Sequence, residues 1–386
     1  MSGKRPSTND PGPPCRRAGK ISPPLTIFAA IFILAWCCTL FVVAVDPLDL
    51  YPWGIPAKLD GADYNQDAAP YILDAVVKDP TIDVVLVGGS TATLFTRAMM
   101  NRLLPGAKNA INLSYSAPYP ADRAIVMDRI ARFGNPKRVI VMLDYIYSLP
   151  AKKILPVFPS YLYDDSILND ARMVGSDTIQ LSIERLAGRS LRLPAWDSGR
   201  YRSALARNYR EFQTRETMEE IRDKIVVKSA GSDTASALFC ADLDSINLQL
   251  VPEAKAFSAR HIALDVVIPP LSLAAYHNGV GFTDGAFMNS QLALRRCAVR
   301  ALDGIEGVRV FSFDNDVWLT GDLANYHDPR HAFGVRVFEY MLRSIAEGSH
   351  RLTRRNVDVE VKLFHDNILR YRVYDSKVRG FDGRGF

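Results

Sequence analysis

Residues 88–91 (GGST) have the composition of a tight turn that presents a nucleophile. They follow residues 83–87, a short apolar run that predicts a buried strand. A serine held there, Ser90, would expose its hydroxyl, while backbone N–H groups and the dipole of a helix predicted over 91–104 favour a developing oxyanion. A plain helix N-cap is the alternative. A phosphate cradle is disfavoured, since no G-x-G-x-x-G or G-K-[ST] pattern follows.

A second candidate lies near the other end of the chain, in residues 325–331 (NYHDPRH). Asp328 and His331 are three residues apart, so they would share a face on the first turn of a helix predicted over 329–346. A carboxylate there can fix the imidazole tautomer and stabilise its cation. The alternative is a helix cap with Pro329 at its first position, and His331 as a surface residue. His327 has no acidic residue three positions before it.

A third candidate is the segment 110–117 (AINLSYSA), where small and polar residues end a predicted strand. Backbone N–H groups near Asn112 and Ser114 could approach a substrate oxygen there. The alternative is a polar loop that follows the strand.

The order of these segments resembles the SGNH (GDSL-like) hydrolase superfamily. Gly88 and Ser90 match its G-x-S turn after the first strand, and Asp328 and His331 match its C-terminal D-x-x-H. The resemblance implies a flavodoxin-like three-layer α/β/α fold with Ser90 as nucleophile, His331 as general base and Asp328 as its orienting partner. Oxyanion or substrate contacts would come from four further residues: Gly89, Thr91, Asn112 and Ser114.

Residues 325–334 are also similar to the N-Y-x-D-x-x-H form of membrane-anchored bacterial members, some of which act in O-acylation of cell-surface polysaccharides. The chain departs from the family at the oxyanion residues. Asn112 is followed by Leu113 and Ser114 instead of the expected glycine, and Asp144 stands where an asparagine amide is expected. An anionic Asp144 would repel an oxyanion.

Strand and helix patterns alternate along most of the chain, which predicts an α/β domain with a mostly parallel sheet covered on both faces. Polar sites in such sheets form at the carboxyl ends of the strands. The expected strands are 83–87, 108–113, 138–143, 263–268 and 308–313, and the expected helices include 119–133, 177–186, 201–225 and 285–302. Residues 146–260 are less regular and form a predicted insertion.

The run 25–45 is apolar and uncharged, and is long enough to cross a bilayer. Basic residues precede it and Asp46 follows it, so the N-terminus is expected in the cytoplasm and the main domain in the periplasm of a bacterium. A cleaved signal peptide is a weaker alternative, because no A-x-A site follows. A lipoprotein signal is disfavoured by Trp36 before Cys37.

These patterns divide the chain into five parts: a disordered cytoplasmic tail (1–24), a transmembrane helix (25–45), a linker and entry segment (46–80), the α/β domain (81–350) and a C-terminal extension (351–386). The domain holds two cysteines, Cys240 and Cys297, which are either a disulfide or two buried thiols. No cysteine or histidine cluster has metal-ligand spacing, and no cofactor is expected. The charge of +5 without a basic, aromatic stripe argues against nucleic acid.

Two functions fit these residues. The first is a serine-dependent ester hydrolase or O-acyltransferase that acts on a cell-envelope glycan, with the inner membrane and an acyl-donating membrane protein as partners. The second is a non-catalytic envelope-assembly or glycan-binding protein on the same fold, favoured by the missing oxyanion residues. Whether the acyl group passes to water or to a sugar depends on water access to the site.

Overall fold

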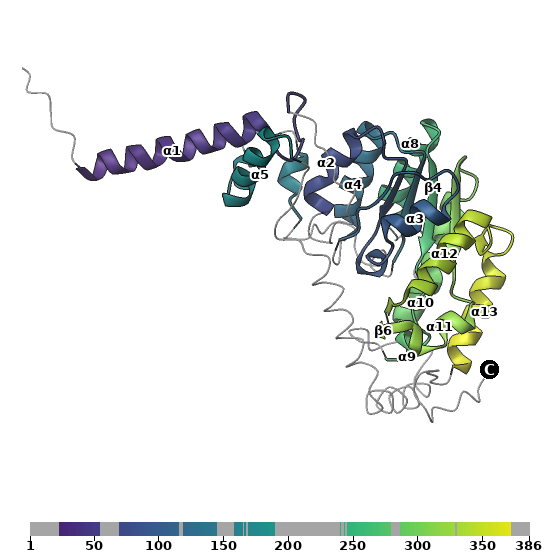
Figure 1. Cartoon of the computed structure of the whole chain (residues 1–386). Coiled ribbons are helices and arrows are strands. Elements are labelled where there is room, and N and C mark those ends of the chain that lie inside the picture. The colour runs from purple at the N-terminus through teal and green to yellow at the C-terminus, as the bar shows by residue number, and fades with distance from the viewer. Residues whose placement is uncertain are drawn as a thin grey trace, which may run out of the picture.

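The protein is an α/β molecule with a long N-terminal helix, α1 (Pro23–Val45), that projects from the folded part (Figure 1). The computed structural model describes residues 23–54, 69–115, 119–144, 158–164, 166, 169–189, 240, 243, 245–278, 286–328 and 330–371.

The central sheet has six strands in the order β2-β1-β3-β4-β5-β8. The strands are β1 (Val84–Val87), β2 (Ala110–Asn112), β3 (Arg138–Met142), β4 (Ala263–Ile268), β5 (Val308–Ser312) and β8 (Arg351–Leu352). The first five are parallel and β8 pairs antiparallel with β5. The mostly parallel sheet predicted by the alternating pattern is therefore confirmed.

Short apolar strands suit this sheet because both of its faces are covered. Alternate residues of a strand point to opposite faces, so Val85 and Val87 join one hydrophobic core while Val84 and Leu86 join a second. The longer helices are α2 (Ala69–Lys78), α3 (Arg97–Leu103), α4 (Pro120–Phe133), α5 (Ser176–Leu186), α8 (Val251–Ala259), α10 (Ala286–Leu302), α12 (Val335–Glu347) and α13 (Val357–Arg370). Residues of α2, α4, α8, α10 and α13 belong to the first core, and those of α3 and α12 to the second.

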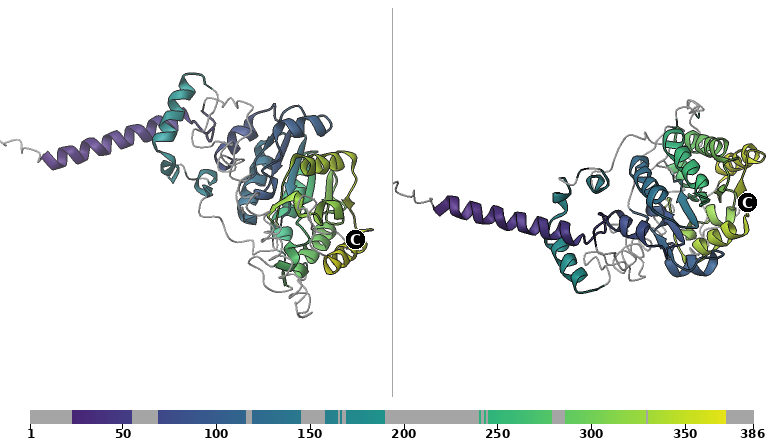
Figure 2. Two further views of the ribbon diagram at one scale, coloured as in Figure 1. Left: turned by 60° about the horizontal axis from the view of Figure 1, so that its bottom comes forward. Right: turned by 90° about the horizontal axis from the view of Figure 1, so that it is seen from above.

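Shorter elements connect these units, and several of them carry the polar residues discussed below. They are the 3-10 turns η1 (Ser90–Ala92), η3 (Ser160–Tyr163), η4 (Asn169–Met173) and η7 (Leu323–Asn325), the π-helical segment η6 (Ser245–Leu250), the helices α9 (Ala275–Asn278) and α11 (Val317–Thr320), and the hairpin of β6 (Tyr326–Asp328) and β7 (His331–Ala332). Figure 2 shows α1 and α5 on one side of the molecule and the sheet with its covering helices on the other.

Several boundaries differ from the sequence prediction. The helix expected over 91–104 is interrupted, because Thr96 adopts extended backbone and its side chain caps a new helix, α3, by accepting the N–H of Met99. The segment assigned to a linker contains the buried helix α2, and the C-terminal extension supplies β8 and α13. The helix predicted over 201–225 lies outside the described residues.

The end of α1 belongs to the folded unit. Residues 26–45 are long and apolar enough to cross a membrane, with a mean hydropathy of 2.7, a property shared by signal sequences. The last turn differs from the rest of the helix, since Val42 is fully buried and joins the first hydrophobic core together with Leu48. The last turn of α1 and the residues that follow it are therefore packed against the folded domain.

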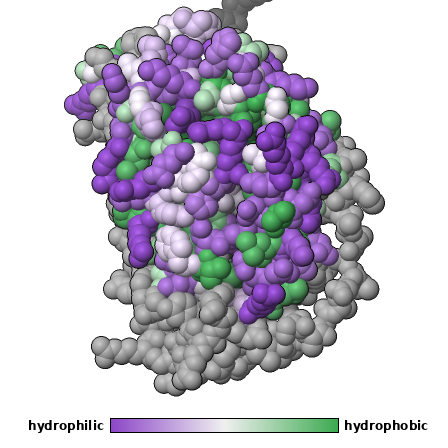
Figure 3. Space-filling view, turned by 90° about the vertical axis from the view of Figure 1, so that its right-hand side faces the viewer, coloured by the Kyte–Doolittle hydropathy of each residue, from purple (hydrophilic) through white to green (hydrophobic). Residues whose placement is uncertain are grey.

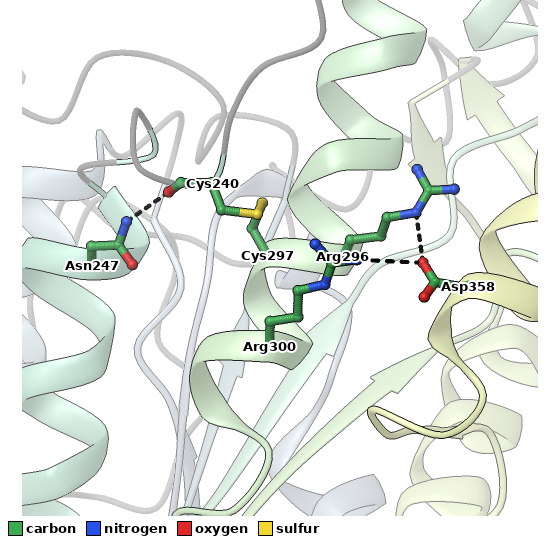
Figure 4. The surroundings of a disulfide bond; sticks show 6 residues. All are labelled: Cys240, Asn247, Arg296, Cys297, Arg300 and Asp358. Atoms are coloured by element: carbon green, nitrogen blue, oxygen red, sulfur yellow. Dashed lines mark hydrogen bonds and ion pairs between the residues drawn. A yellow bond between two sulfur atoms is a disulfide. The ribbon is translucent and has the colours of Figure 1, made fainter.

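Cys240 and Cys297 form a disulfide, which decides between the two alternatives left by the sequence (Figure 4). Their Cα atoms are 5.2 Å apart, within the range that a disulfide spans. Cys297 lies on α10, and the carbonyl of Cys240 accepts a 2.7 Å hydrogen bond from the Asn247 side chain. The bond thus fastens the end of the 146–260 insertion to a helix that covers the sheet.

Candidate functional site

Ser90 lies where the sequence predicted it, directly beyond the carboxyl end of β1. The chain leaves β1 through Gly88 and Gly89 and enters the 3-10 turn η1 at Ser90, which is half-buried. The strand order reverses at this point, because β2 lies on one side of β1 and β3 lies on the other. Crevices at such reversals are the usual ligand sites of open α/β sheets.

His331 meets Ser90 although 241 positions separate them in the chain. The Ser90 Oγ and the His331 Nε2 are 2.7 Å apart, a full hydrogen bond between two half-buried side chains. His331 begins β7, which pairs with β6 in a small hairpin beside η1. This contact is the geometry that a serine nucleophile and its general base require.

The predicted helical turn that would join Asp328 to His331 is wrong. Asp328 ends β6 and His331 begins β7, so they are opposite each other across an antiparallel hairpin. The helix α12 starts only at Val335, after Gly334 adopts a φ of 102°, a conformation that favours glycine. Cross-strand pairing therefore brings the two residues together by a different route from the predicted one.

Asn112 holds the turn that carries Ser90 in place. Its side-chain amide donates to the carbonyls of Ala92 (2.8 Å) and Phe95 (2.9 Å), and its oxygen accepts the N–H of Ser114 (2.9 Å). Both amide hydrogens of Asn112 and the N–H of Ser114 are thus engaged with protein. As the structure stands, neither group is free to donate to a substrate oxyanion.

Other polar groups around the turn are unpaired within the described part of the chain. The Thr91 and Ser114 hydroxyls are buried and have no hydrogen-bond partner there. The turn itself is closed by the 2.9 Å bond from the Ala92 N–H to the Gly89 carbonyl. Gly89 and Thr91 flank Ser90 in the chain, and the Ser114 hydroxyl lies close to Gly88 at the start of the same turn.

The charge of Asp144 is neutralised by a residue that the sequence analysis overlooked. The Arg123 guanidinium, almost fully buried, lies 2.5 Å from the Asp144 carboxylate and also donates to the Met142 carbonyl. Arg123 precedes Met127 by four residues, so it shares the buried face of α4. An arginine on the apolar face of a predicted helix was the available signal for a buried ion pair.

Gly88 is required by close packing beneath Ser90. A Cβ added there would lie 2.6 Å from the Ala92 Cβ and 3.0 Å from the Met142 Cγ and the Ser114 Oγ. We expect Gly88→Ala to lower the free energy of unfolding by about 1–3 kcal/mol, because the turn must shift to admit the methyl group. Urea unfolding measures the loss. Gly175→Ala is the control, since its Cβ would meet nothing within 4 Å, and equal effects of the two substitutions would contradict the packing argument.

A polar cavity of about 320 Å³ lies beyond the end of β5, away from Ser90. Its lining includes Asp316 and His350, whose Oδ1 and Nε2 atoms are 3.1 Å apart. The hydrogen bond to Asp316 raises the pKa of His350 above its ordinary value, burial opposes this, and the charges of Asp316, Glu360 and Glu347 add to the increase. The hydroxyl of Tyr340 contacts both members of the pair.

This pair predicts that stability falls as the pH rises above neutrality. A histidine whose folded pKa is raised contributes stability that is complete below its unfolded pKa of 6.5 and is lost as the pH rises through the folded value. Urea unfolding at pH 6 and pH 9 should show this decrease, and Asp316→Asn should reduce it. Asp366→Asn, on α13, is the matched control. A pH dependence unchanged by Asp316→Asn would contradict the assignment to His350.

No protein-family model matches the chain, and no curated protein is significantly similar to it. Within the described residues, no group of three or more His, Cys, Asp or Glu side chains is placed to hold a metal ion.

Proposed function

We propose that the protein is a serine-dependent acyl-ester hydrolase or O-acyltransferase of the SGNH type, anchored in a membrane by α1 and acting on a cell-envelope glycan. The observation that carries this proposal is the 2.7 Å contact between the Ser90 Oγ and the His331 Nε2. Two residues that are 241 positions apart in the chain meet beyond the carboxyl end of β1. Open α/β sheets usually bind their ligands at this edge. Packing alone gives no reason for this contact between two half-buried polar groups.

The chemistry follows from that contact. The Ser90 oxygen attacks the acyl carbonyl while its proton passes to the His331 Nε2, giving a tetrahedral oxyanion. Collapse expels the leaving alcohol, which takes the proton back from His331 and leaves an acyl ester on Ser90. Water or a sugar hydroxyl then attacks that ester, again with His331 as base. The proposed oxyanion donor is the backbone N–H of Ser90, at the start of the turn η1.

The fold supports the assignment to this class. The first five strands run in the order 2-1-3-4-5, which is the flavodoxin-like order of doubly wound sheets. Ser90 follows the first strand, and His331 lies near the C-terminal end of the sheet domain, as in the G-x-S and D-x-x-H blocks of SGNH proteins. Asp328 is the proposed orienting residue, since it pairs with His331 across the hairpin.

The proposed location follows from α1 and its flanks. Basic residues precede the helix and acidic residues follow it, the arrangement of a segment that exports what comes after it. A cleaved signal would remove Val42 from the hydrophobic core, so an uncleaved anchor fits the packing better. A tethered enzyme outside the bacterial inner membrane would meet envelope polysaccharides, with a membrane protein as the acyl donor.

Labelling with a fluorophosphonate probe tests the catalytic claim. The full chain, purified in detergent, should react covalently through Ser90, and Ser90→Ala should lose the label. Ser290→Ala, whose hydroxyl bonds within α10, is the control and should react as the wild type does. Absence of labelling in the wild type, or unchanged labelling of Ser90→Ala, would reject the proposal.

A non-catalytic role on the same fold is favoured by one observation. The Asn112 amide, the expected helper of the oxyanion, is fully engaged with the carbonyls of Ala92 and Phe95. Removing one oxyanion donor costs roughly 10²–10³ in rate. If Ser90→Ala leaves the cellular phenotype intact while deletion of residues 146–240 abolishes it, this second function replaces the first.

A further inference from the structure

The side of the molecule beside α1 carries exposed apolar groups on a rigid helix. Figures 1 and 2 both show α5 against the C-terminal end of α1. Two large apolar side chains of α5, Ile183 and Leu186, are each 58% exposed. Trp53, which follows α1, is 53% exposed, and its indole N–H donates to the Val43 carbonyl at 3.2 Å. By contrast, the face of the molecule farthest from α1 is mainly hydrophilic (Figure 3).

The length of α1 determines where these groups lie. Its side chains are mostly exposed as far as Leu40, whereas Val42 and Val45 are buried by the protein. Residues 26–40 rise only about 22 Å at roughly 1.5 Å per residue, less than the ~30 Å of a hydrocarbon core. If α1 spans the bilayer, its last turn must also lie near the edge of the hydrocarbon. Because α5 packs against the C-terminal end of α1, α5 lies at the same level of the bilayer.

The helix α5 has the chemistry of an interfacial segment. Leu181 and Ser182 are buried against the protein, while Ile183 and Leu186 point outward. It carries two acidic side chains, Asp177 and Glu184, and one basic side chain, Arg185, so apolar insertion and not attraction to anionic lipid would hold it in lipid. A tryptophan at the same level, Trp53, is typical of the membrane–water interface, where an apolar ring and a polar N–H are both satisfied.

A buried polar cluster fixes α5 to the end of α1. The Asp46 carboxylate accepts the N–H groups of Leu50 (2.8 Å) and Tyr51 (2.7 Å), which closes the turn after the helix. Asp49 lies 3.6 Å from the Lys78 ammonium of α2 and 4.0 Å from the Arg185 guanidinium of α5. Burial raises the pKa of Asp46 to about 6 despite these hydrogen bonds. Because these groups are buried, α5 is held in one orientation relative to α1.

We propose that α5 and Trp53 form a membrane-surface platform that lies in the headgroup region of the bilayer on the side where α1 emerges. The proposal rests on the membrane anchoring proposed above for α1, and its ligand is the phospholipid interface itself. The platform fixes the orientation of the α/β domain against the bilayer, instead of leaving the domain free on a flexible tether.

Quenching of tryptophan fluorescence by brominated lipids tests the anchor and the platform separately. The full chain is placed in phosphatidylcholine nanodiscs as variants that each keep one tryptophan, with the others changed to phenylalanine. Trp36, at the middle of α1, should be quenched most by lipids brominated at acyl carbons 11 and 12. Trp53 should be quenched most by lipids brominated at carbons 6 and 7. Trp318, on α11, should not be quenched.

The outcomes are distinct. Quenching of Trp36 without quenching of Trp53 would reject the platform and keep the anchor, whereas quenching of neither would reject both. In the variant that keeps only Trp53, Ile183→Asp with Leu186→Asp should reduce the quenching at least twofold, since two charges would enter the interface. The same change at Val359 and Leu363, exposed on α13, is the matched control and should leave it unchanged. Unchanged quenching in the α5 variant would contradict the role of α5.

Discussion

Replacing either Ser90 or His331 by alanine should lower the kcat for hydrolysis of p-nitrophenyl acetate by about 10³–10⁴-fold, because nucleophile and base act as one unit. The double variant should be no slower than either single variant. Once the serine oxygen is absent, the imidazole at 2.7 Å has no proton left to accept from it. Initial rates on the purified full chain measure all three.

His365→Ala is the control for this cycle, since His365 lies on α13 and should leave the kcat unchanged. Multiplicative losses in the double variant would mean that the two residues act independently. Such a result would contradict a shared proton transfer, even if each single substitution impaired the enzyme.

The disulfide should have the second largest effect. Cys240 and Cys297 are 57 positions apart, and closing a loop of that length restricts the unfolded chain by roughly 4 kcal/mol in the chain-entropy model. Changing both to alanine should therefore lower the free energy of unfolding by about 2–4 kcal/mol. Urea unfolding of the full chain in detergent measures the change.

Reduction gives a matched test of the same bond. Dithiothreitol should lower the unfolding midpoint of the wild type and have no effect on the double alanine variant. Cys37 and Cys38 are free thiols on α1, so their replacement by alanine should leave the midpoint in place. Insensitivity of the wild type to reductant would show that the bond does not contribute to stability.

Much of the sheet could be predicted from the sequence because most residues of its longer strands are buried. Short, mainly apolar runs such as 138–142 and 263–268 are typical of buried strands in an α/β protein, and the strands β3 and β4 lie there. The helix α4 was equally plain, since its apolar period ends at Gly134. The local pattern of apolar residues is thus sufficient to predict an element when the residues it marks as apolar are also the buried ones.

Other elements depend on contacts that local pattern does not contain. The strand β8 is two residues long and exists because it pairs with β5. The hairpin before α12 replaced a predicted helical turn because His331 and Ala332 pair with β6 instead of continuing the helix. Asp328 and His331 are nevertheless register partners in the hairpin, since residues three apart can be neighbours in either conformation.

At the candidate site, the two side chains that meet there, Ser90 and His331, could be singled out from their types and order. The contacts that hold the surrounding residues could not. Asn112 was expected to face a substrate and instead bonds the turn that carries Ser90. The position of Arg123 on the apolar face of a predicted helix indicates a buried ion pair, but only the structure identifies Asp144 as its partner. Side-chain amides and buried guanidinium groups have many possible partners, and only the tertiary structure selects among them.

The position of β3 has a consequence for how the chain assembles during synthesis. β3 ends at Met142, yet its second neighbour, β4, begins only at Ala263. A nascent chain can complete β2, β1 and β3 well before β4 emerges, and until then Val139 and Val141 belong to an open sheet edge with unpaired backbone groups. During synthesis this edge therefore stays open to pairing with other chains until β4 arrives or another protein covers it.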